Sequence, residues 1–454
     1  MADAAITDGR LLKRLGFAFA AAVGLGAMVG AGLMRTSGSV IDEVPYPWLV
    51  LALWALGGVH ALLSSNVASE LVTSIPKTGG IFVPVRAAFG DSMGLLAGWV
   101  MYLSYGAAGA SLSIVCADFL TILLPSLADR TAPVACMFLL AIFGLNWLGV
   151  REGSMAQTTG SSVKLILLCA VIGIALFAGP PRPGAFAVAA SDSAPAVGLF
   201  AIIVAYQMIY GAYAGWDSAI VYVEEDKNAL TNIPRAMALS IGAVTLVYVL
   251  FNLSILQALD LEAIGGSGLP IALVLGNVFG PNGAIAVAVL AIILASTALN
   301  ANVMGGPRTL FELARDGRFL SMATRVNAGG TPHVAFAITA AMIVLLIFSG
   351  SFESVFRLMG ALIIFGFVIY DAALFRLRWT QPDLPRPFRA IGYPVLPALV
   401  LLIDTTLLIA FIAADPMSGL TMAALIALCI PVGIVLHPKK MPSTKQEPEY
   451  EIIG

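Results

Sequence analysis

The sequence predicts an all-α, polytopic membrane protein with twelve transmembrane helices. Hydrophobic residues make up 59% of the 454-residue chain and charged residues only 11%, whereas soluble domains carry about 25% charged residues. Apolar windows of about 20 residues, the length that crosses a bilayer as a helix, recur along the whole chain. The connections between them are short. We therefore expect one integral membrane domain over residues 15–437, with tails at 1–14 and 438–454.

The predicted spans cover residues 15–36, 46–68, 93–116, 132–149, 160–179, 198–222, 237–258, 282–305, 333–349, 354–375, 394–413 and 417–437. The first run follows a polar segment, and no small-residue cleavage site comes after it. We therefore expect a retained span rather than a signal peptide.

The distribution of lysine and arginine predicts the orientation of these spans. With a cytoplasmic N-terminus, only Arg35, Arg130, Arg182 and Arg357 of the 24 basic residues fall outside, and Lys164 lies within a span. Basic residues concentrate on the cytoplasmic side of membrane proteins. We expect a multi-pass protein of the plasma (inner) membrane with both termini in the cytoplasm.

The first span is interrupted by Gly24, Gly26, Gly30 and Gly32. Each glycine in a helix interior costs about 0.8–1.0 kcal/mol relative to alanine, and backbone groups at membrane depth still need partners. One interpretation is close helix packing through the small residues Gly26 and Gly30. The other is a break in the helix whose free backbone groups bind a ligand.

The sixth span has a matching feature at its centre, where Gly211 and Gly215 stand among tyrosines and precede Asp217. Interrupted helices at corresponding places in two halves of a chain indicate a midplane binding site in transporters built from inverted repeats. Half-helix N-termini attract anions, and half-helix C-termini attract cations. An α-amino acid carries both charges, which favours the ligand-binding interpretation.

Five sets of residues resemble motifs of the amino acid–polyamine–organocation superfamily of transporters, from about Gly16 to Leu396. In chain order they are Gly26–Leu33; Ala68–Leu71 with Ile75–Gly80 and Ala88–Gly90; Glu224–Glu225 with Asn232–Arg235; Gly306–Arg308 with Ala314–Gly317 and Thr331–Pro332; and Pro385–Phe388 with Gly392–Pro394.

This resemblance implies a LeuT-type five-plus-five inverted repeat with broken helices 1 and 6, plus two extra C-terminal helices. Repeat one would cover about 15–179, repeat two about 198–375, and helices 11 and 12 about 394–437. It also implies alternating-access transport of amino acids or related amines.

The resemblance also implies a substrate site made largely of backbone. The substrate carboxylate would lie on the amides of Gly30, Ala31 and Gly32, approached past Ala27 and Met28. Carbonyls of the sixth span would hold the amine, at Tyr210, Gly211, Ala212 and Ala214. Relatives commonly place an aromatic gate where this chain has Gly211, flanked by Tyr210 and Tyr213. Ala31 stands where serine is frequent.

Lys164, near the start of the fifth span, has two interpretations. A long side chain there can reach the headgroups, whereas an ionisable residue inside a membrane is a functional candidate. Some sodium-independent members of the superfamily carry a lysine here whose ammonium replaces a sodium ion. The resemblance therefore implies that Lys164 bridges the first-span break and the eighth span, near Ser296, Thr297 or Asn300.

For the other charged and aromatic residues the sequence leaves two alternative roles. Asp217 is either a helix cap or a contact for the substrate amine. Tyr105, with Tyr102 and Ser104, either lines the side-chain pocket or packs between helices.

Glu224, Glu225 and Asp226 end the sixth span, where acids are unfavourable unless cations pair with them. They are either an inner gate, paired with Arg308, Arg315 or Arg86, or a solvated acidic end. We expect Glu70 to pair with a base in a loop.

Taken together, the sequence predicts a sodium-independent secondary transporter of amino acids, with proton symport as the first interpretation. Exchange and polyamine or other amine transport are the alternatives. Motifs of hydrolases, metalloproteases and nucleotide-binding loops are missing, so an enzyme is not expected, and a non-transporting sensor is a remote alternative. We expect no cofactor and no metal, because Cys116, Cys136, Cys169 and Cys429 lie in apolar segments, and we assign His60, His333 and His437 no chemistry. The expected partners are the substrate, protons and the lipid bilayer, without nucleic acid or an obligatory protein partner.

Overall fold

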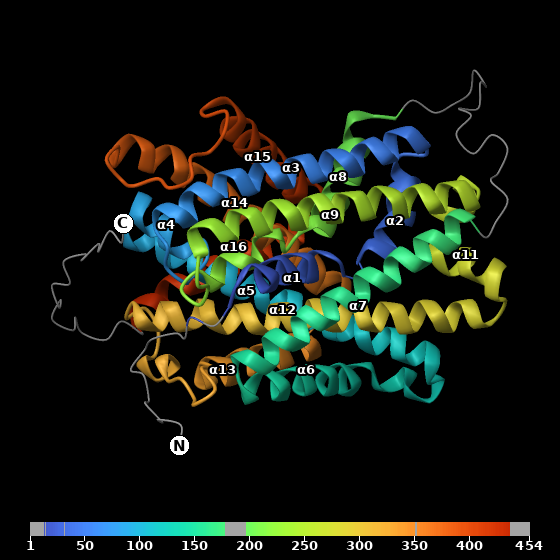
Figure 1. Ribbon diagram of the computed structural model, residues 1–454, viewed down its shortest axis with the longest axis horizontal. Coiled ribbons are helices and arrows are strands. Elements are labelled where there is room, and N and C mark those ends of the chain that lie inside the picture. Colours follow the sequence, from blue (N-terminus) through green and yellow to red (C-terminus); the bar gives the residue numbers. More distant parts are fainter. Residues whose placement is uncertain (1–12, 14, 31, 178–196, 350–351, 436–454) are drawn as a thin grey trace.

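The computed structural model describes residues 13, 15–30, 32–177, 197–349 and 352–435. Within these ranges all regular secondary structure is helical, apart from one isolated bridge between Leu15 and Asp226. Most of the long helices run roughly along one axis of the molecule (Figure 1). The predicted tails lie outside the described residues except for Lys13, and so does His437.

The helices follow one another in this order: α1 (Phe17–Met28), α2 (Gly32–Glu43), α3 (Pro47–Ser74), α4 (Phe82–Phe89), α5 (Asp91–Leu123), η1 (Pro125–Arg130), α6 (Thr131–Leu148), α7 (Val150–Phe177), α8 (Leu199–Tyr213), η2 (Trp216–Tyr222), α9 (Ala229–Ala258), α10 (Leu261–Gly265), α11 (Pro270–Phe279), α12 (Asn282–Arg315), η3 (Ser321–Thr324), α13 (His333–Ser349), α14 (Phe352–Thr380), α15 (Val395–Ala414) and α16 (Pro416–Val435).

Nine helices in the described part of the chain are long and apolar enough to cross a membrane, or ten if the bent pair α1 and α2 forms one span. These spans establish a multi-pass membrane protein. Each predicted span coincides with a helix or a pair of helices. Two of the twelve coincide with shorter apolar helices, His333–Ser349 and the Pro416–Ala427 part of α16. The sequence did not predict α4, α10 or α11.

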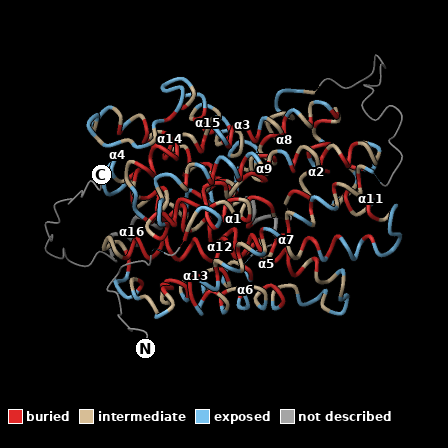
Figure 2. The backbone as a smooth tube through the Cα atoms, in the orientation of Figure 1, coloured by how far each residue is buried: buried red, intermediate tan, exposed pale blue. Residues whose placement is uncertain are grey.

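The core lies around α1, α5 and α12, where buried residues concentrate in Figure 2. α5 packs against both α12 and α14, while α1 packs against α7, α9, α12 and η2. The small residues of α1 let these neighbours approach closely, which is how membrane helices commonly associate. The broken first span therefore lies in the interior, with protein on several sides.

Candidate functional site

The first span breaks between Met28 and Gly32, and the two helices meet at 45°. Two side chains bind carbonyls that the break exposes. The Lys164 ammonium donates to the carbonyls of Gly26 at 2.6 Å and Val29 at 2.5 Å. The Tyr248 hydroxyl lies 2.8 Å from the Met28 carbonyl and 2.9 Å from the Ala212 carbonyl. The cost of unpaired backbone in a membrane interior is thereby reduced on the carbonyl side.

The four glycines of the first span divide into two pairs. A Cβ added to Gly26 would lie 1.9 Å from Gln157 Nε2, and one added to Gly24 would lie 3.2 Å from Ser240 Oγ. A Cβ on Gly30 would meet nothing closer than 3.9 Å, and one on Gly32 would meet nothing within 4 Å. The first pair therefore serves packing, whereas the second pair borders open space. The packing interpretation thus holds for Gly26 but not for Gly30, and ligand binding at Gly30 and Gly32 stays a prediction.

The second break separates α8 from η2 and touches the first. Gly215 lies between them with a φ of +101°, a conformation that favours glycine. A Cβ at this position would come within 2.8 Å of Ala27 Cβ. Gly215 therefore permits both the turn and the contact between the two broken helices.

A cavity of about 110 Å³ lies where the two breaks meet. Nine predicted substrate residues line it: Ala27, Met28, Gly30, Gly32, Tyr105, Gly211, Ala212, Ala214 and Asp217. Ser104, Ser111 and Asn302 contribute polar side chains, and the cavity extends along α2 to Arg35 and Thr36. Ala31 lies outside the described residues. Sequence reasoning missed Ser111 and Asn302, because a lone polar residue in a span does not reveal which way it faces.

Two predicted substrate residues lie elsewhere. Tyr210 and Tyr213 line a separate cavity of about 10 Å³ beside His60, and the Tyr213 hydroxyl donates to the Trp54 carbonyl at 2.9 Å. Successive residues of a helix point in different directions, so Gly211 and Ala212 face the central cavity while these two tyrosines face α3. Neither tyrosine side chain lines the central cavity.

Lys164 is fully buried and turns toward the first-span break rather than toward the headgroups. Among the described residues it makes no hydrogen bond to Ser296, Thr297 or Asn300. Ser296 faces Cys116 at 3.5 Å, and Thr297 donates to the Ile293 carbonyl. Asn300 donates to Gln157 Oε1 at 2.8 Å. The predicted bridge from Lys164 therefore reaches the first span, and Gln157 makes the link between α7 and α12.

Gln157 belongs to a polar chain that sequence reasoning missed. Its amide lies beside Ser161 at 3.2 Å, and Ser161 donates to the Ala22 carbonyl at 2.7 Å. Asn146 of α6 donates to Asn300 at 2.7 Å. These polar side chains link α1, the first half of the broken span, to α7, α12 and α6, and they hold α1 in place beside the break.

One end of the molecule, on the left of Figure 1, carries a dense set of ion pairs and is called the charged end below. At its centre Arg308 makes a bidentate pair with Glu225, with one contact at 3.0 Å, and lies over the Tyr222 ring at 4.7 Å. Both members of the pair are buried. The Leu15 amide donates to the Glu225 carbonyl at 2.9 Å. The segment before α1 is thus tied to the loop after η2.

Glu224 continues the charged end toward the surface. It accepts two hydrogen bonds from Arg315, at 2.6 and 2.8 Å, and one from the Thr78 amide at 3.0 Å. Burial alone would raise the pKa of the Glu224 carboxyl, but the hydrogen bonds and charge of Arg315, together with the Thr78 amide, bring it below its ordinary value. Both glutamates therefore have the arginine partners that the sequence predicted.

Two predicted partnerships at this end are different in the structure. Arg86 pairs with Asp91 and Asp316 instead of the acids after η2. Asp226 accepts hydrogen bonds from the Asn228 amide and the Asn232 side chain, and no cation among the described residues pairs with it. Arg86 lies on α4, an element the sequence did not predict, so its direction could not be foreseen.

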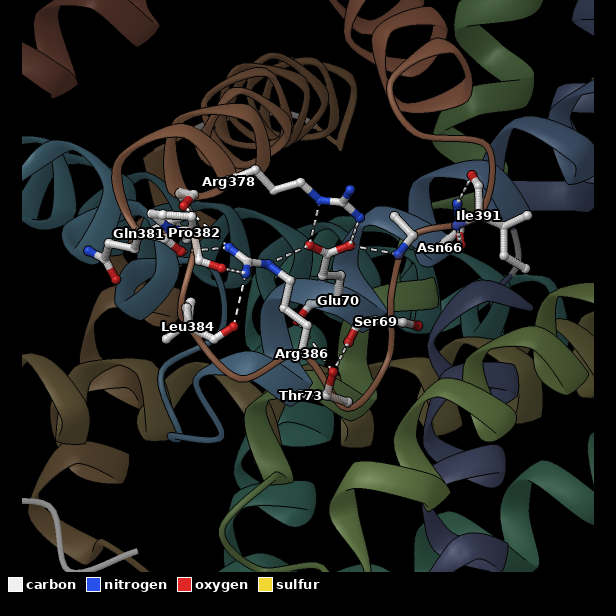
Figure 3. Close-up of polar contacts among 12 residues, drawn as sticks. Asn66, Ser69, Glu70, Thr73, Arg378, Gln381, Pro382, Leu384, Arg386 and Ile391 are labelled. Carbon is white, nitrogen blue, oxygen red and sulfur yellow. Dashed lines mark hydrogen bonds and ion pairs between the residues drawn. The ribbon is translucent and has the colours of Figure 1, made fainter.

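Glu70 fixes a further loop to the same end, as Figure 3 shows. It receives two hydrogen bonds from Arg378 at 2.5 and 2.8 Å and one from the Ala390 amide at 2.6 Å, and it lies 3.2 Å from Arg386. Asn66, one turn earlier, exchanges hydrogen bonds with Ile391. The predicted loop base for Glu70 is thus Arg386, joined by Arg378 at the end of α14.

Comparison with known proteins places this architecture in a family. A family model described as "Amino acid permease" matches residues 15–446. The serine/threonine exchanger SteT of Bacillus subtilis is 26% identical over 402 residues, covering 87% of this chain and 90% of the relative. The branched-chain amino acid permease BcaP of the same organism is 25% identical, covering 88% of each chain. Human Asc-type amino acid transporter 1 is 26% identical, covering 90% and 79%. Because the family model spans nearly the whole chain, the protein belongs to the amino acid permease family of the amino acid–polyamine–organocation superfamily, whose members are transporters rather than enzymes.

Proposed function

We propose that this protein is a sodium-independent secondary transporter that moves an amino acid with a proton by alternating access. The observation that carries the proposal is the cavity between the two broken helices, which α2 enters with its N-terminus at Gly32. The first amides of a helix have no intrahelical partner and attract anions. A substrate carboxylate at Gly30 and Gly32 satisfies them.

The opposite side of the cavity suits an ammonium group. Asp217 lies in the first turn of η2, lines the cavity and is only 8% exposed. Gly211 and Ala214 bring backbone of the second break to the same wall. An amine without a carboxylate leaves the α2 amides unpaired, so this arrangement favours amino acids over polyamines. Ser104 and Tyr105 of α5 then face the substrate side chain.

Sodium independence rests on Lys164. Its ammonium occupies the carbonyls of Gly26 and Val29, the kind of unwound-helix carbonyls that coordinate sodium in transporters with broken helices. A fixed positive charge there repels a second cation. We propose that Lys164 takes the structural place of that ion and that loss of its proton loosens the break.

For the arrangement of spans and their orientation, the proposal adopts the expectations from the sequence. Twelve spans form two inverted repeats of five, at about 15–179 and 198–375, followed by two further helices at about 394–437. Both termini lie in the cytoplasm of a cell whose plasma (inner) membrane holds the protein. The charged end, with Glu224, Glu225 and Arg308, is then the inner gate. This arrangement supports alternating access, because the cavity extends toward Arg35 and not toward that gate.

The test is uptake and counterflow in proteoliposomes with a panel of labelled amino acids, with and without sodium and a pH gradient. We expect sodium-independent uptake that rises with an acidic exterior, and reduced uptake in Lys164→Ala with loss of its pH dependence. Lys164→Ala that retains full, pH-dependent uptake contradicts the role of Lys164. Transport of no amino acid or amine in the panel overturns the function.

Exchange is a second candidate, because one similar relative is named an exchanger. Uptake that requires an amino acid inside the vesicle, and does not respond to a pH gradient, favours exchange over symport.

A further inference from the structure

Three ionisable side chains outside the central cavity meet in the interior of the helix bundle. They are His60 of α3, Asp371 of α14 and Asp404 of α15. Their exposed fractions are 3%, 2% and 1%. Each lies close to the middle of a helix that is long enough to cross the membrane. None of them belongs to the proposed substrate site.

The three groups are arranged as a cluster. His60 Nε2 lies 3.3 Å from Asp404 Oδ1, and Asp371 interacts with Asp404 where α14 packs against α15. Yet both oxygens of Asp404, Oδ2 of Asp371 and Nε2 of His60 have no satisfied hydrogen bond. No lysine or arginine of the described chain pairs with either aspartate. Buried polar atoms are almost always hydrogen-bonded, so two ionised aspartates are an unfavourable state of this cluster.

A proton bound by the cluster relieves this. Two ionised carboxylates can only accept hydrogen bonds, and like charges in contact within a membrane are strongly unfavourable. One proton on the aspartate pair turns the repulsive contact into a hydrogen bond, as in other carboxylate dyads. A second proton on His60 neutralises the remaining carboxylate. The geometry therefore requires hydrogen atoms that isolated aspartates do not carry near neutrality.

A small cavity connects the cluster with the second helix break. The cavity of about 10 Å³ beside His60 is about the size of one water molecule. It is also lined by Tyr206 and Tyr210 of α8 and by Ala214, and Ala214 lines the central cavity as well. The His60 ring lies 6.1 Å from the Tyr206 ring and 5.6 Å from the Tyr210 ring. His60 of the cluster therefore shares a cavity with residues of the second helix break.

The other titratable groups that face the cluster are tyrosines and a further aspartate. Tyr206 and Tyr210 face it from α8, and Tyr370 adjoins Asp371 on α14. Asp217 of η2 is a further acid within electrostatic range of Tyr210 and Tyr370. Lys164 contacts the other break. None of these groups supplies a positive charge to the two aspartates.

We propose that His60, Asp371 and Asp404 form a buried proton-binding site in which the two aspartates share one proton, and that this site couples proton movement to the second helix break. The coupling part rests on the proposed function. The proton-binding part does not, because it concerns the ground state of the protein alone. Opening of α3 and α15 away from α14 would expose the shared proton to water.

The first test is infrared spectroscopy of the full-length protein in lipid vesicles. A protonated carboxyl has a carbonyl stretch, sensitive to deuterium exchange, that a carboxylate lacks. We expect the wild type to show this band at neutral pH and Asp371→Asn to lose it, because Asp404 then pairs with protonated His60. In Asp404→Asn the band persists at a shifted frequency, since Asp371 then has no cation. Asp383→Asn, at an exposed loop carboxyl, is the matched control and keeps the wild-type spectrum.

The second test is accumulation of substrate under a pH gradient. One pH unit corresponds to about 1.4 kcal/mol per proton, or about tenfold accumulation of a solute carried with one proton. We expect accumulation approaching this value in the wild type and in His333→Gln, and a ratio near unity in Asp371→Asn, Asp404→Asn and His60→Gln. Counterflow in the three cluster variants shows that they are folded and bind substrate.

The outcomes separate the two proposals. A wild-type spectrum without the carboxyl band at neutral pH, or one left unchanged by both aspartate substitutions, overturns the proton site, and the wild-type measurement needs no variant to fold. Normal accumulation in all three cluster variants overturns the coupling role. If no amino acid is transported but the spectra behave as expected, the proposed function fails and the proton site stands.

Discussion

The two ends of the central cavity are held in different ways. Toward the charged end, the bidentate Arg308–Glu225 pair is buried, and Glu224, Arg315 and Glu70 surround it with further pairs. Toward the other end, Arg35 of α2 lies 3.6 Å from Asp118 of α5, and each side chain is 35% exposed. The cavity reaches Arg35 but none of the charged-end residues.

This difference predicts which ion pairs cost more to separate. A buried ion pair is costly to break, because the partner left behind has no water to solvate it, whereas an exposed pair contributes little. The Arg308–Glu225 pair is therefore expected to stabilise the structure more than the Arg35–Asp118 pair does.

The largest effect is expected from Arg308→Met, which leaves Glu225 buried without its cation. Removal of one member of a buried pair costs about 3–5 kcal/mol. We expect a large fall in the thermal unfolding midpoint of the purified protein. The double variant Arg308→Met with Glu225→Gln should recover much of the lost unfolding midpoint, because no buried charge is then left without a partner. An unfolding midpoint equal to that of the wild type in the single variant would contradict a stabilising role of the buried pair.

Glu70→Ala is expected to have the second largest effect. Glu70 is 1% exposed and binds Arg378, Arg386 and the Ala390 amide (Figure 3). Hydrogen bonds to a charged group contribute about 1.5–3 kcal/mol. We expect a lower unfolding midpoint and faster proteolysis in the loop between α14 and α15. Asn66→Ala, one turn away, is the control for local disturbance, and equal effects of the two changes contradict a special role for the carboxylate.

Glu224→Gln is expected to have a smaller, pH-dependent effect. Its side chain is 24% exposed and that of Arg315 is 29% exposed, so we expect about 0.2–1 kcal/mol at neutral pH. The pKa of Glu224 in the folded protein is lowered. Its stabilising contribution is therefore fully present above its unfolded pKa and is lost as pH falls through the folded pKa. The difference in unfolding midpoint between wild type and variant should shrink on acidification. A difference that grows on acidification would contradict the lowered pKa of Glu224.

The smallest effect is expected from Arg35→Gln at the opposite end, where we expect about 0.5 kcal/mol or less. Thermal unfolding measured at low and high salt checks this, because an exposed pair is screened by ions. A loss as large as that of Arg308→Met would erase the proposed difference between the two ends.

Much of the helical layout follows from local sequence, because apolar length and glycine content are local properties. The break at Gly30 and Gly32, the pairing of Glu225 with Arg308 and the orientation of Lys164 toward the first span agree with what the residues and motifs predicted. The substrate and coupling roles of these residues stay predictions. The helix α4 was missed because its eight residues are too few to give a periodic signal.

The partners that sequence reasoning could not identify come from distant segments. Tyr248 joins the Met28 and Ala212 carbonyls across gaps of 220 and 36 residues. The separation between His60 and Asp404 is larger still, so each is an isolated polar residue in its own span. Nothing in a single span reveals which neighbour it faces. The direction of the Tyr210 and Tyr213 side chains could not be predicted for the same reason, since the rotation of α8 depends on packing against α3.

The ammonium of Lys164 is covalently attached to the helix that it helps to position. A dissolved ion at such a place has an occupancy that varies with the composition of the surrounding fluid, and it must be captured again in every cycle. A tethered amine cannot diffuse away when its proton leaves, so no new metal cation has to be captured from the solution. The contacts to the Gly26 and Val29 carbonyls are therefore made by a group that belongs to the polypeptide itself.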